Sequence, residues 1–347
     1  MTTMRFRPGF WWLLALVLGA LLPWIIPDPY IRHLLILCCF YVVLTLSLNL
    51  LVGFSGQTSF AHAAFFGVGA YTSAILTTRY GVSFWIGLPA AGLMATFISL
   101  LIAIPSLRLR GPYLAIATIG FQEIVVIVLS QWTSVTRGPM GITSIPKPQI
   151  GSFVIRTLPH WYLLAFALVV LTVIVMFRIS RSRIGLELIA LREDEVAARA
   201  MGVNTYKMKV LAFTVSSLIA GLAGSIYAHY INSIDPYSFM IGLSATVLVM
   251  VLAGGVGSIV GSILSAVGLT LLPEFLRQFT SAGLRMVLFG AALVAVILFM
   301  PEGFAGVARQ IRERRWKRGK PLPEEGAVAE AAGAAVPPSR TLEAEHE

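Results

Sequence analysis

Residues 160–177 read HWYLLAFALVVLTVIVMF and contain no Asp, Glu, Lys or Arg. A run of this length is typical of a helix that crosses the ~30 Å hydrocarbon core of a bilayer, which takes about 17–25 apolar residues. Because lipid gives the backbone no hydrogen-bond partners, a helix is the expected spanning element. The stretch therefore predicts a transmembrane helix, and the remainder of the chain repeats its pattern.

Nine further apolar runs have similar lengths. The chain is 57% hydrophobic and only 12% charged, whereas a soluble globular chain carries about 25% charged residues. No alternating ten-residue pattern indicates a barrel. We expect an all-α polytopic helical membrane protein with about 8–10 transmembrane helices, in which run 57–78 is open to a re-entrant path. The further runs are 10–26, 33–52, 57–78, 84–107, 112–131, 208–230, 237–253, 257–273 and 284–300.

The basic residues predict an orientation. If the spans alternate and the N-terminus is inside, 19 of the 26 Lys and Arg residues lie on the cytoplasmic side, as the positive-inside rule requires. Both termini and the loop 178–209 are then cytoplasmic. The net charge of +10 is accounted for by this orientation and by anionic membrane lipid, and nucleic acid is not an expected partner. The longest outer connection, residues 132–159, is the expected surface for an external partner.

Composition divides the chain into two parts. Residues 1–307 form the predicted transmembrane domain, with its first run kept as an uncleaved helix. Residues 308–347 form a cytoplasmic extension. Its first part, 308–320, holds seven basic residues and one acidic residue, which suits anionic headgroups. The remainder is rich in Ala, Pro and Glu and is expected to be disordered.

The charged stretch ALREDEVAARAMGV, residues 190–203, interrupts this apolar chain. Glu195 and Arg199 are spaced to pair on one helix, and Gly202 suits a left-handed helix end. The sequence predicts one short amphipathic helix on the cytoplasmic face. A helix lying on lipid headgroups is one reading, but such helices are usually rich in Lys and Arg. The acidic run 193–195 favours a docked protein partner.

This stretch resembles the coupling loop of bacterial ABC importer permeases, specifically the M-type subunit of the branched-chain amino acid family. Gly202 falls one residue later than in the general form of that loop. Three other stretches resemble the same family: NLLVGFSGQTSFAHAAFFGVGAY at 49–71, GPYLAIAT at 111–118 with Glu123 following, and PEGFAG at 301–306. The resemblance implies a type II ABC importer permease fold. It also implies that the loop inserts into an ATPase subunit through Arg192, Glu193, Glu195, Ala197, Ala198 and Gly202.

The resemblance implies a function and a set of partners. The chain would be the permease subunit that moves Leu, Ile and Val across the bacterial inner membrane. Its partners would be a homologous second permease, two ABC ATPases and an extracytoplasmic solute-binding protein. ATP would be hydrolysed by the ATPases, because this chain has no phosphate-binding loop. It also lacks the short motifs of metal sites and hydrolases, so no bound cofactor, no metal and no enzymatic activity are expected.

Polar residues at membrane depth are costly and often functional. Glu123, near the middle of its run, is expected to face the bundle interior. Glycines around residues 53–69 allow a helix to break there, and the freed dipole ends suit a zwitterionic solute. The predicted translocation path comprises Asn49, Gln57, Ser59, His62 and Glu123; purely structural hydrogen bonding by these residues remains the alternative.

Two glycines predict a close helix contact. Gly257, Gly261 and Ser265 recur at four-residue spacing, as in small-residue interfaces of membrane helices. A second permease subunit is a candidate partner for that contact.

Three other functions stay open at this point. The same family includes importers of urea and short amides. A proton-coupled secondary transporter would use His62 and Glu123 as its relay and would leave the acidic cytoplasmic helix without a role. A membrane-embedded enzyme would need a cluster of catalytic polar residues, which the sequence does not offer.

Overall fold

A computed structural model of the chain describes residues 19–106, 111–151 and 153–277, together with positions 283–284, 287–288, 290–291, 294 and 303. All of them belong to one unit, residues 1–306. The predicted runs 10–26 and 284–300 lie mostly outside the described residues. The extension 308–347 lies wholly outside them, so the domain boundary and the tail remain predictions.

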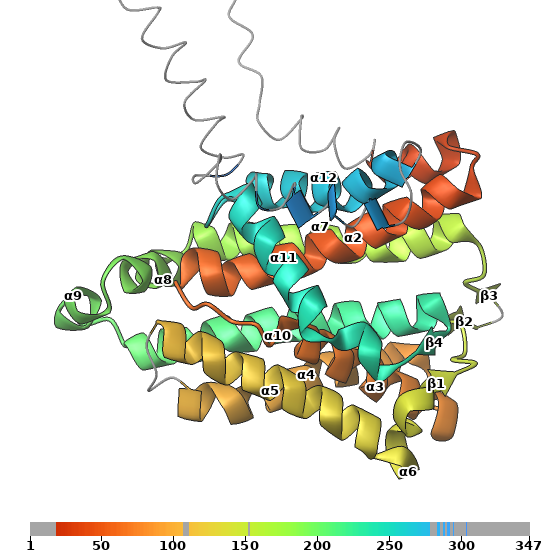
Figure 1. Ribbon diagram of the computed structural model, residues 1–347, viewed down its shortest axis with the longest axis horizontal. Helices are drawn as coiled ribbons and strands as arrows, with labels where there is room; N and C mark the ends of the chain where they lie inside the picture. The colour runs from red at the N-terminus through yellow and green to blue at the C-terminus, as the bar shows by residue number, and fades with distance from the viewer. Residues whose placement is uncertain are drawn as a thin grey trace, which may run out of the picture. The chain divides into compact units, whose positions relative to one another are not determined.

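Eight long helices make up the described bundle. Seven helical segments are long and apolar enough to span a membrane. The eighth helix, α3, is less apolar. Together with the non-helical residues 55–61 before it, α3 forms another passage of the chain through the bundle (Figure 1). The fold is therefore a polytopic helical bundle, as predicted. The helices are α2 Pro29–Asn49, continued by the π-helix η1 Leu50–Phe54, α3 His62–Arg79, α4 Phe84–Ser106, α5 Pro112–Gln131, α7 Leu158–Ser180, α10 Thr205–Ile231, α11 Ile241–Gly254 and α12 Ile259–Arg277.

Polar caps set several helix ends. The Asp28 side chain accepts a hydrogen bond from the Tyr30 N–H at 2.8 Å, and Pro29 occupies the first turn of α2, where its missing N–H costs nothing. Asn204 caps α10 by accepting from the Lys207 N–H at 3.0 Å. Asn232 ends α10 in a left-handed conformation with φ 68°, which Asn tolerates better than most residues.

The helices form two groups on either side of α10. Figure 1 shows α2, α7 and α12 on one side and α3, α4 and α5 on the other, with α11 running obliquely between them. Small residues allow α3 to pack closely on α10. A Cβ atom on Gly69 would lie 2.3 Å from the Gly221 carbonyl oxygen, so this contact requires glycine, as in other membrane helix pairs.

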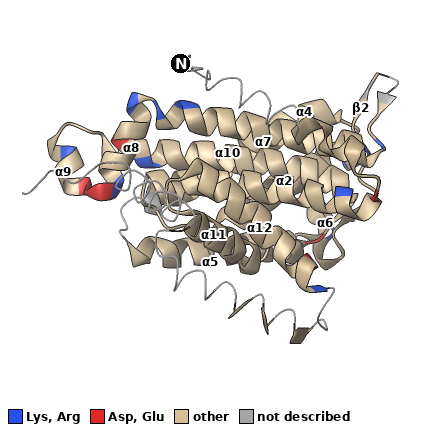
Figure 2. Cartoon of the chain, turned by 90° about the horizontal axis from the view of Figure 1, so that it is seen from above, with Lys and Arg blue, Asp and Glu red and all other residues tan. Residues whose placement is uncertain are grey.

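Charged residues gather at the two ends of the described bundle, and its middle shows few of them (Figure 2). One end carries the short helices α8 Arg183–Glu193 and α9 Glu195–Ala200. Among the described residues, seven basic residues lie in or beside this α8–α9 end and six at the opposite end: Arg178, Arg181, Arg183, Arg192, Arg199, Lys207 and Lys209 against Arg32, Arg79, Arg137, Lys147, Arg156 and Arg277. The predicted orientation therefore depends on basic residues outside the described part and remains a prediction.

The connection between α5 and α7 is folded at the opposite end. It contains α6 Thr133–Thr136, the 3-10 turn η2 Gly138–Met140 and three short strands. Strand β1, Ile142–Thr143, pairs antiparallel with β4, Ser233–Ile234, in the register Ile142 with Ile234. Strand β2, Gln149–Ile150, pairs antiparallel with β3, Phe153–Val154. The stretch expected to meet an external partner thus has local structure of its own.

Two spans are interrupted inside the bundle. The chain leaves η1 and runs without helical structure through residues 55–61 before α3 begins at His62, which is the break that the glycines predict. The His62 ring lies 2.8 Å from the hydroxyl of Ser47 within α2. From the other end, the 3-10 turn η3, Pro236–Phe239, precedes α11. Non-helical backbone at this depth is tolerated only where protein or a water-filled cavity surrounds it.

Candidate functional site

The α8–α9 corner is built on Asp194. This residue is extended, with φ −156° and ψ 114°, so the predicted single helix is wrong and the charged stretch forms two. The Asp194 carboxylate caps α9 by accepting from the N–H groups of Val196 at 2.7 Å and Ala197 at 3.0 Å. These hydrogen bonds, the one from Ala197 more than the one from Val196, lower the pKa of Asp194, since they favour its charged form.

Glu195 faces the bundle. One carboxylate oxygen lies 3.0 Å from Arg199 Nη2, which confirms the predicted pair, and the other lies 2.9 Å from Nζ of Lys209. The Lys209 side chain on α10 is only 9% exposed, and Ala198, which lies on α9 with Glu195, is buried. Glu195 and Ala198 therefore fasten α9 to α10. They are not on the outer surface where the resemblance places a contact with an ATPase.

The outer face of the corner combines large apolar side chains with exposed charged residues, Glu193, Asp194 and Arg199. Val196 is 63% exposed and Met201 85% exposed. Of the residues named from the resemblance, Glu193, Ala197 and Gly202 are also exposed, and Gly202 has the predicted left-handed conformation with φ 86°. In the sequence, Val196 and Met201 are the large apolar residues between Asp194 and Gly202.

Arg192 joins the corner to the end of α2. Its Nη1 donates to the Gly53 carbonyl oxygen at 2.7 Å. Its Nε and Nη2 donate to Glu193 Oε1 at 3.1 and 2.5 Å. The acceptor, Gly53, lies in the π-helix η1, a feature frequent at functional sites. Arg192 is thus an internal link rather than an outward-facing contact.

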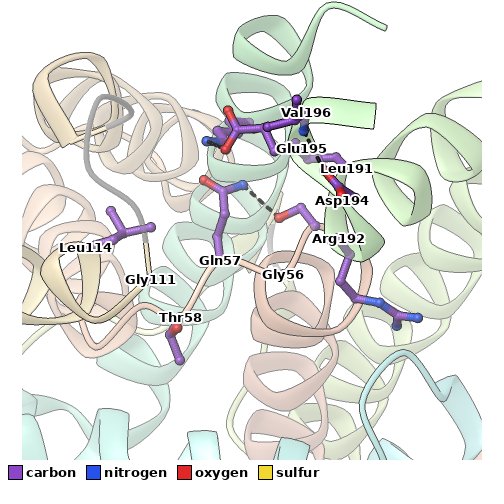
Figure 3. Close-up of a pocket in the computed structure, with 12 residues that line it drawn as sticks. Gly56, Gln57, Thr58, Gly111, Leu114, Leu191, Arg192, Asp194, Glu195 and Val196 are labelled. Atoms are coloured by element: carbon purple, nitrogen blue, oxygen red, sulfur yellow. Dashed lines mark hydrogen bonds and ion pairs between the residues drawn. The ribbon is translucent and has the colours of Figure 1, made fainter. Parts of the chain in front are cut away.

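A pocket of about 220 Å³ lies beside this link, between the non-helical segment, the start of α5 and the α8–α9 corner. Figure 3 shows Gln57 between Leu114 on one side and Asp194 and Glu195 on the other. Gln57 Nε2 donates to the Ser55 hydroxyl at 2.7 Å. Its Oε1 is buried and has no hydrogen-bond partner among the described residues.

Asn49 is a structural amide. Its Nδ2 donates to the Ser258 carbonyl oxygen at 3.2 Å and to the Ser262 hydroxyl at 3.0 Å, and its Oδ1 accepts from the Gly257 N–H at 2.9 Å. These bonds tie the end of α2 to the start of α12. With most of its hydrogen-bonding capacity used, the fully buried Asn49 does not open onto a path.

The predicted glycine contact is inside the chain. A Cβ atom on Gly261 would lie 1.8 Å from the Gly254 carbonyl oxygen, so α11 and α12 meet at these two residues. Gly257, with φ 82°, lies against the Gly53 carbonyl oxygen. The close contact is confirmed, and in the described structure its partners lie within this chain, while a contact of these glycines with a second subunit stays a prediction.

Ser59 and His62 are buried at the break. The Ser59 hydroxyl accepts from the Ala61 N–H at 3.3 Å, and His62 Nε2 pairs with Ser47. Each is at most 1% exposed. Both side chains therefore support the interrupted backbone, which is the structural alternative to a path-lining role.

The expectation that Glu123 faces the bundle interior is wrong. Glu123 is exposed on α5 and has no hydrogen-bond or ion-pair partner among the residues described. Its neighbour Gln122 is fully buried instead. Gln122 Oε1 accepts from the Ala64 N–H at 2.7 Å, and Nε2 donates to the Phe239 carbonyl oxygen at 2.5 Å. The sequence-based prediction selected the charged Glu123 and missed the neighbouring amide of Gln122.

A second residue of α5 extends this contact. The Thr118 hydroxyl accepts from the Phe60 N–H at 3.0 Å. Thr118 and Gln122 lie one helical turn apart on α5, and they hold the non-helical segment at Phe60 and the first turn of α3 at Ala64. The four-residue spacing of Thr118 and Gln122 inside an apolar run was the signal available in the sequence.

Residues for a proton relay or a metal centre are not assembled in the described structure. His62 is bonded to Ser47 on α2, whereas Glu123 points out of the bundle on α5. Among the described residues, no three His, Cys, Asp or Glu side chains are grouped so that they could hold a metal ion. In the described residues the site consists of hydrogen-bonded links between helices.

Known proteins share this sequence over most of its length. Residues 30–297 match the family described as branched-chain amino acid transport system permease component. The chain is 39% identical to the high-affinity branched-chain amino acid transport system permease protein LivM of Escherichia coli K12 over 292 residues, which cover 78% of this chain and 68% of that protein. It is 24% identical to the permease protein LivH of the same strain, covering 77% of this chain and 91% of LivH. No solved structure matches it significantly.

Proposed function

The chain belongs to the branched-chain amino acid transport system permease family, and we propose that it is the membrane-spanning subunit of an ATP-binding-cassette importer of branched-chain amino acids. Separate ATPase subunits would drive it. The observation that carries the mechanism is the α8–α9 corner, which exposes the apolar side chains of Val196 and Met201 while Arg192 ties its inner side to the interrupted span at Gly53.

The solute is inferred from the relatives. The names of LivM and LivH refer to branched-chain amino acid transport, which favours Leu, Ile and Val over the urea and short-amide importers of the family. Competition between labelled leucine and unlabelled urea or acetamide for uptake tests this choice. Competition by the amides at the concentrations that work for leucine would contradict it.

A homologous second permease is the proposed partner in the membrane. LivM and LivH are both permease proteins of the branched-chain system in one strain, and both resemble this chain. The exposed carboxylate of Glu123 supports the same conclusion. An ionised side chain near the bilayer centre costs roughly 2.5–3.5 kcal/mol even on insertion scales. We therefore infer that this face of α5 is covered by the second permease and borders an aqueous path.

The ATPases would bind the outer face of α9. Val196 and Met201 are large apolar residues exposed at the end of a membrane protein, where a partner gains by covering them. Two ATPases on the cytoplasmic side and a solute-binding protein on the outer side complete the proposed assembly. The chain would then lie in the bacterial inner membrane with both termini cytoplasmic.

A proton-coupled carrier is less well supported. Its relay would require His62 and Glu123 to exchange a proton, whereas His62 is buried against Ser47 and Glu123 is exposed on α5. ATP-independent accumulation of leucine in vesicles that contain the permeases alone would restore that alternative.

Two matched substitutions test the importer directly. Met201→Asp places a charge on the proposed ATPase contact, whereas Met140→Asp does the same at an equally exposed position, 87%, at the opposite end of the bundle. We expect Met201→Asp to abolish co-purification of the ATPases and ATP-dependent leucine uptake, and Met140→Asp to retain co-purification of the ATPases. Normal ATPase binding by Met201→Asp would rule out this docking surface.

A further inference from the structure

The Gln122 side chain joins three elements inside the bundle. From α5 it accepts from the first turn of α3 and donates to the last residue of η3, directly before α11. Ser244 on α11 completes the cluster: its hydroxyl accepts from the Ala63 N–H at 2.8 Å and lies 3.5 Å from Gln122 Oε1. The starts of both interrupted spans therefore meet at one amide.

This meeting point has a continuous connection to the α8–α9 corner. Arg192 holds the carbonyl group of Gly53, and residues 55–61 lead from there into the bundle without helical structure. The segment is then bonded to α5 at Thr118 through the Phe60 N–H and, one turn later, at Gln122. A displacement of the corner that pulls on Gly53 would therefore be passed to α5.

The far side of α5 is the face that carries Glu123. Because the two residues are adjacent in one helix, a rotation or tilt of α5 that moves Gln122 also moves Glu123. Hydrogen bonds to the backbone resist such movement more than apolar contacts do, since breaking one leaves a buried polar group unpaired. Rigid elements joined by such bonds can carry a shift between distant sites.

We propose that Gln122 is a positioning residue for transport: it transmits the movement of the α8–α9 corner to α5 by holding the starts of α3 and α11. This inference rests on the proposed function, because it needs an ATPase to move the corner. It predicts that a complex without the Gln122 amide still hydrolyses ATP but imports less leucine for each ATP, although α3 and α11 are still folded in the bundle.

The first test compares two Gln→Leu substitutions on the same helix. Gln122→Leu removes the amide, and Gln131→Leu makes the same change at the exposed end of α5. Both are measured as the full complex in proteoliposomes, with leucine imported per ATP hydrolysed as the readout. We expect Gln122→Leu to lower this ratio at least about fivefold and Gln131→Leu to leave it unchanged. A wild-type ratio in assembled Gln122→Leu complex would overturn the proposal.

The second test keeps the proposal falsifiable if Gln122→Leu does not assemble. In Gln122→Glu the protonated carboxyl has one acceptor oxygen and one O–H donor, which replace both bonds of the amide, whereas the ionised form can only accept. Its import ratio, divided by that of the wild type at each pH, should rise as the pH falls from about 8 to 5.5. A relative ratio that is flat with pH would overturn the proposal.

The other titratable groups around Gln122 are the same in the wild type and in Gln122→Glu. They are His62 and Tyr71 on α3, Asp235 before η3 and Glu123 on α5, so the comparison with the wild type removes their contribution. The wild type also separates the two proposals. Absence of ATP-dependent import by the wild-type complex would refute the proposed function, whereas normal wild-type import with unaffected variants would refute the role of Gln122 alone.

Discussion

Arg192 and Gly53, 139 residues apart, are joined by a hydrogen bond of 2.7 Å between a guanidinium nitrogen and a backbone carbonyl oxygen. The bond connects the charged corner at one end of the bundle to the π-helix that ends the α2 segment, directly before the non-helical backbone. Charge-assisted hydrogen bonds are shorter and stronger than neutral ones. The α8–α9 corner is therefore attached to the bundle by a specific hydrogen bond at Gly53, in addition to its packing contacts.

Arg192→Gln should weaken this attachment by about 1–2 kcal/mol, because the replacement loses the charge and the reach of the guanidinium. We expect ATP-driven uptake to fall about 5–30-fold, while the ATPases still bind through the outer face of α9. Uptake in proteoliposomes and co-purification of the ATPases measure the two effects. Arg183→Gln, at an exposed position at the start of α8, is the control. Equal uptake by both variants would contradict the role of the Arg192 link.

Lys209→Met should destabilise the subunit. It leaves the Glu195 carboxylate with Arg199 but without its buried partner, and removing one member of a partly buried pair costs about 1–3 kcal/mol. We expect a lower midpoint of thermal unfolding in detergent. The double variant Lys209→Met with Glu195→Gln should recover part of the lost stability, because residue 195 then carries no negative charge. Lys207→Met, exposed two residues earlier, should have little effect. Identical midpoints for both lysine variants would show that the ion pair is not stabilising.

Glu123→Gln should lower leucine uptake and leave the amount of protein in the membrane unchanged, because the exposed carboxylate is proposed to border an aqueous path. Glu123→Leu extends the test. If the face of α5 met lipid, leucine would be favoured there, and the variant would be more stable with normal uptake. We expect the opposite, a loss of uptake without a gain in stability. Expression is measured by immunoblot and uptake with labelled leucine.

Asp194→Ala should loosen α9, because the carboxylate caps the N–H groups of Val196 and Ala197. Asp194→Asn should largely retain the helix, since the amide oxygen also caps. Hydrogen exchange at residues 195–201 measures the difference. Because the folded-state pKa of Asp194 is lowered, its contribution is fully present above the ordinary Asp pKa, about 3.9, and is lost as the pH falls through the lower folded value. Exchange that accelerates already between pH 7 and 5 would contradict this assignment.

The sequence determined the class of the protein. Apolar runs such as 160–177 dictate a helical membrane bundle, since a bilayer leaves the backbone no other way to satisfy its hydrogen bonds over that length. The glycines around Gly53 predicted an interrupted span, and the i, i+4 spacing of Glu195 and Arg199 predicted their ion pair. The family resemblance came from stretches that include Gly53 and Glu195, residues 49–71 and 190–203. The match over residues 30–297 confirms that resemblance.

The tertiary structure decided which side of each helix is inside. In the sequence, Glu123 stands out because a charge at membrane depth is costly, and Gln122 does not. A shift of one residue turns a helix by about 100°, so these neighbours point in different directions, and only the packing of α3 and α11 against α5 determines that the amide is the buried one. In the same way, the local pattern of residues 190–203 could not place Glu195 against Lys209 or Arg192 against Gly53. Contacts between residues far apart in the chain depend on how whole helices pack, and no short stretch contains that information.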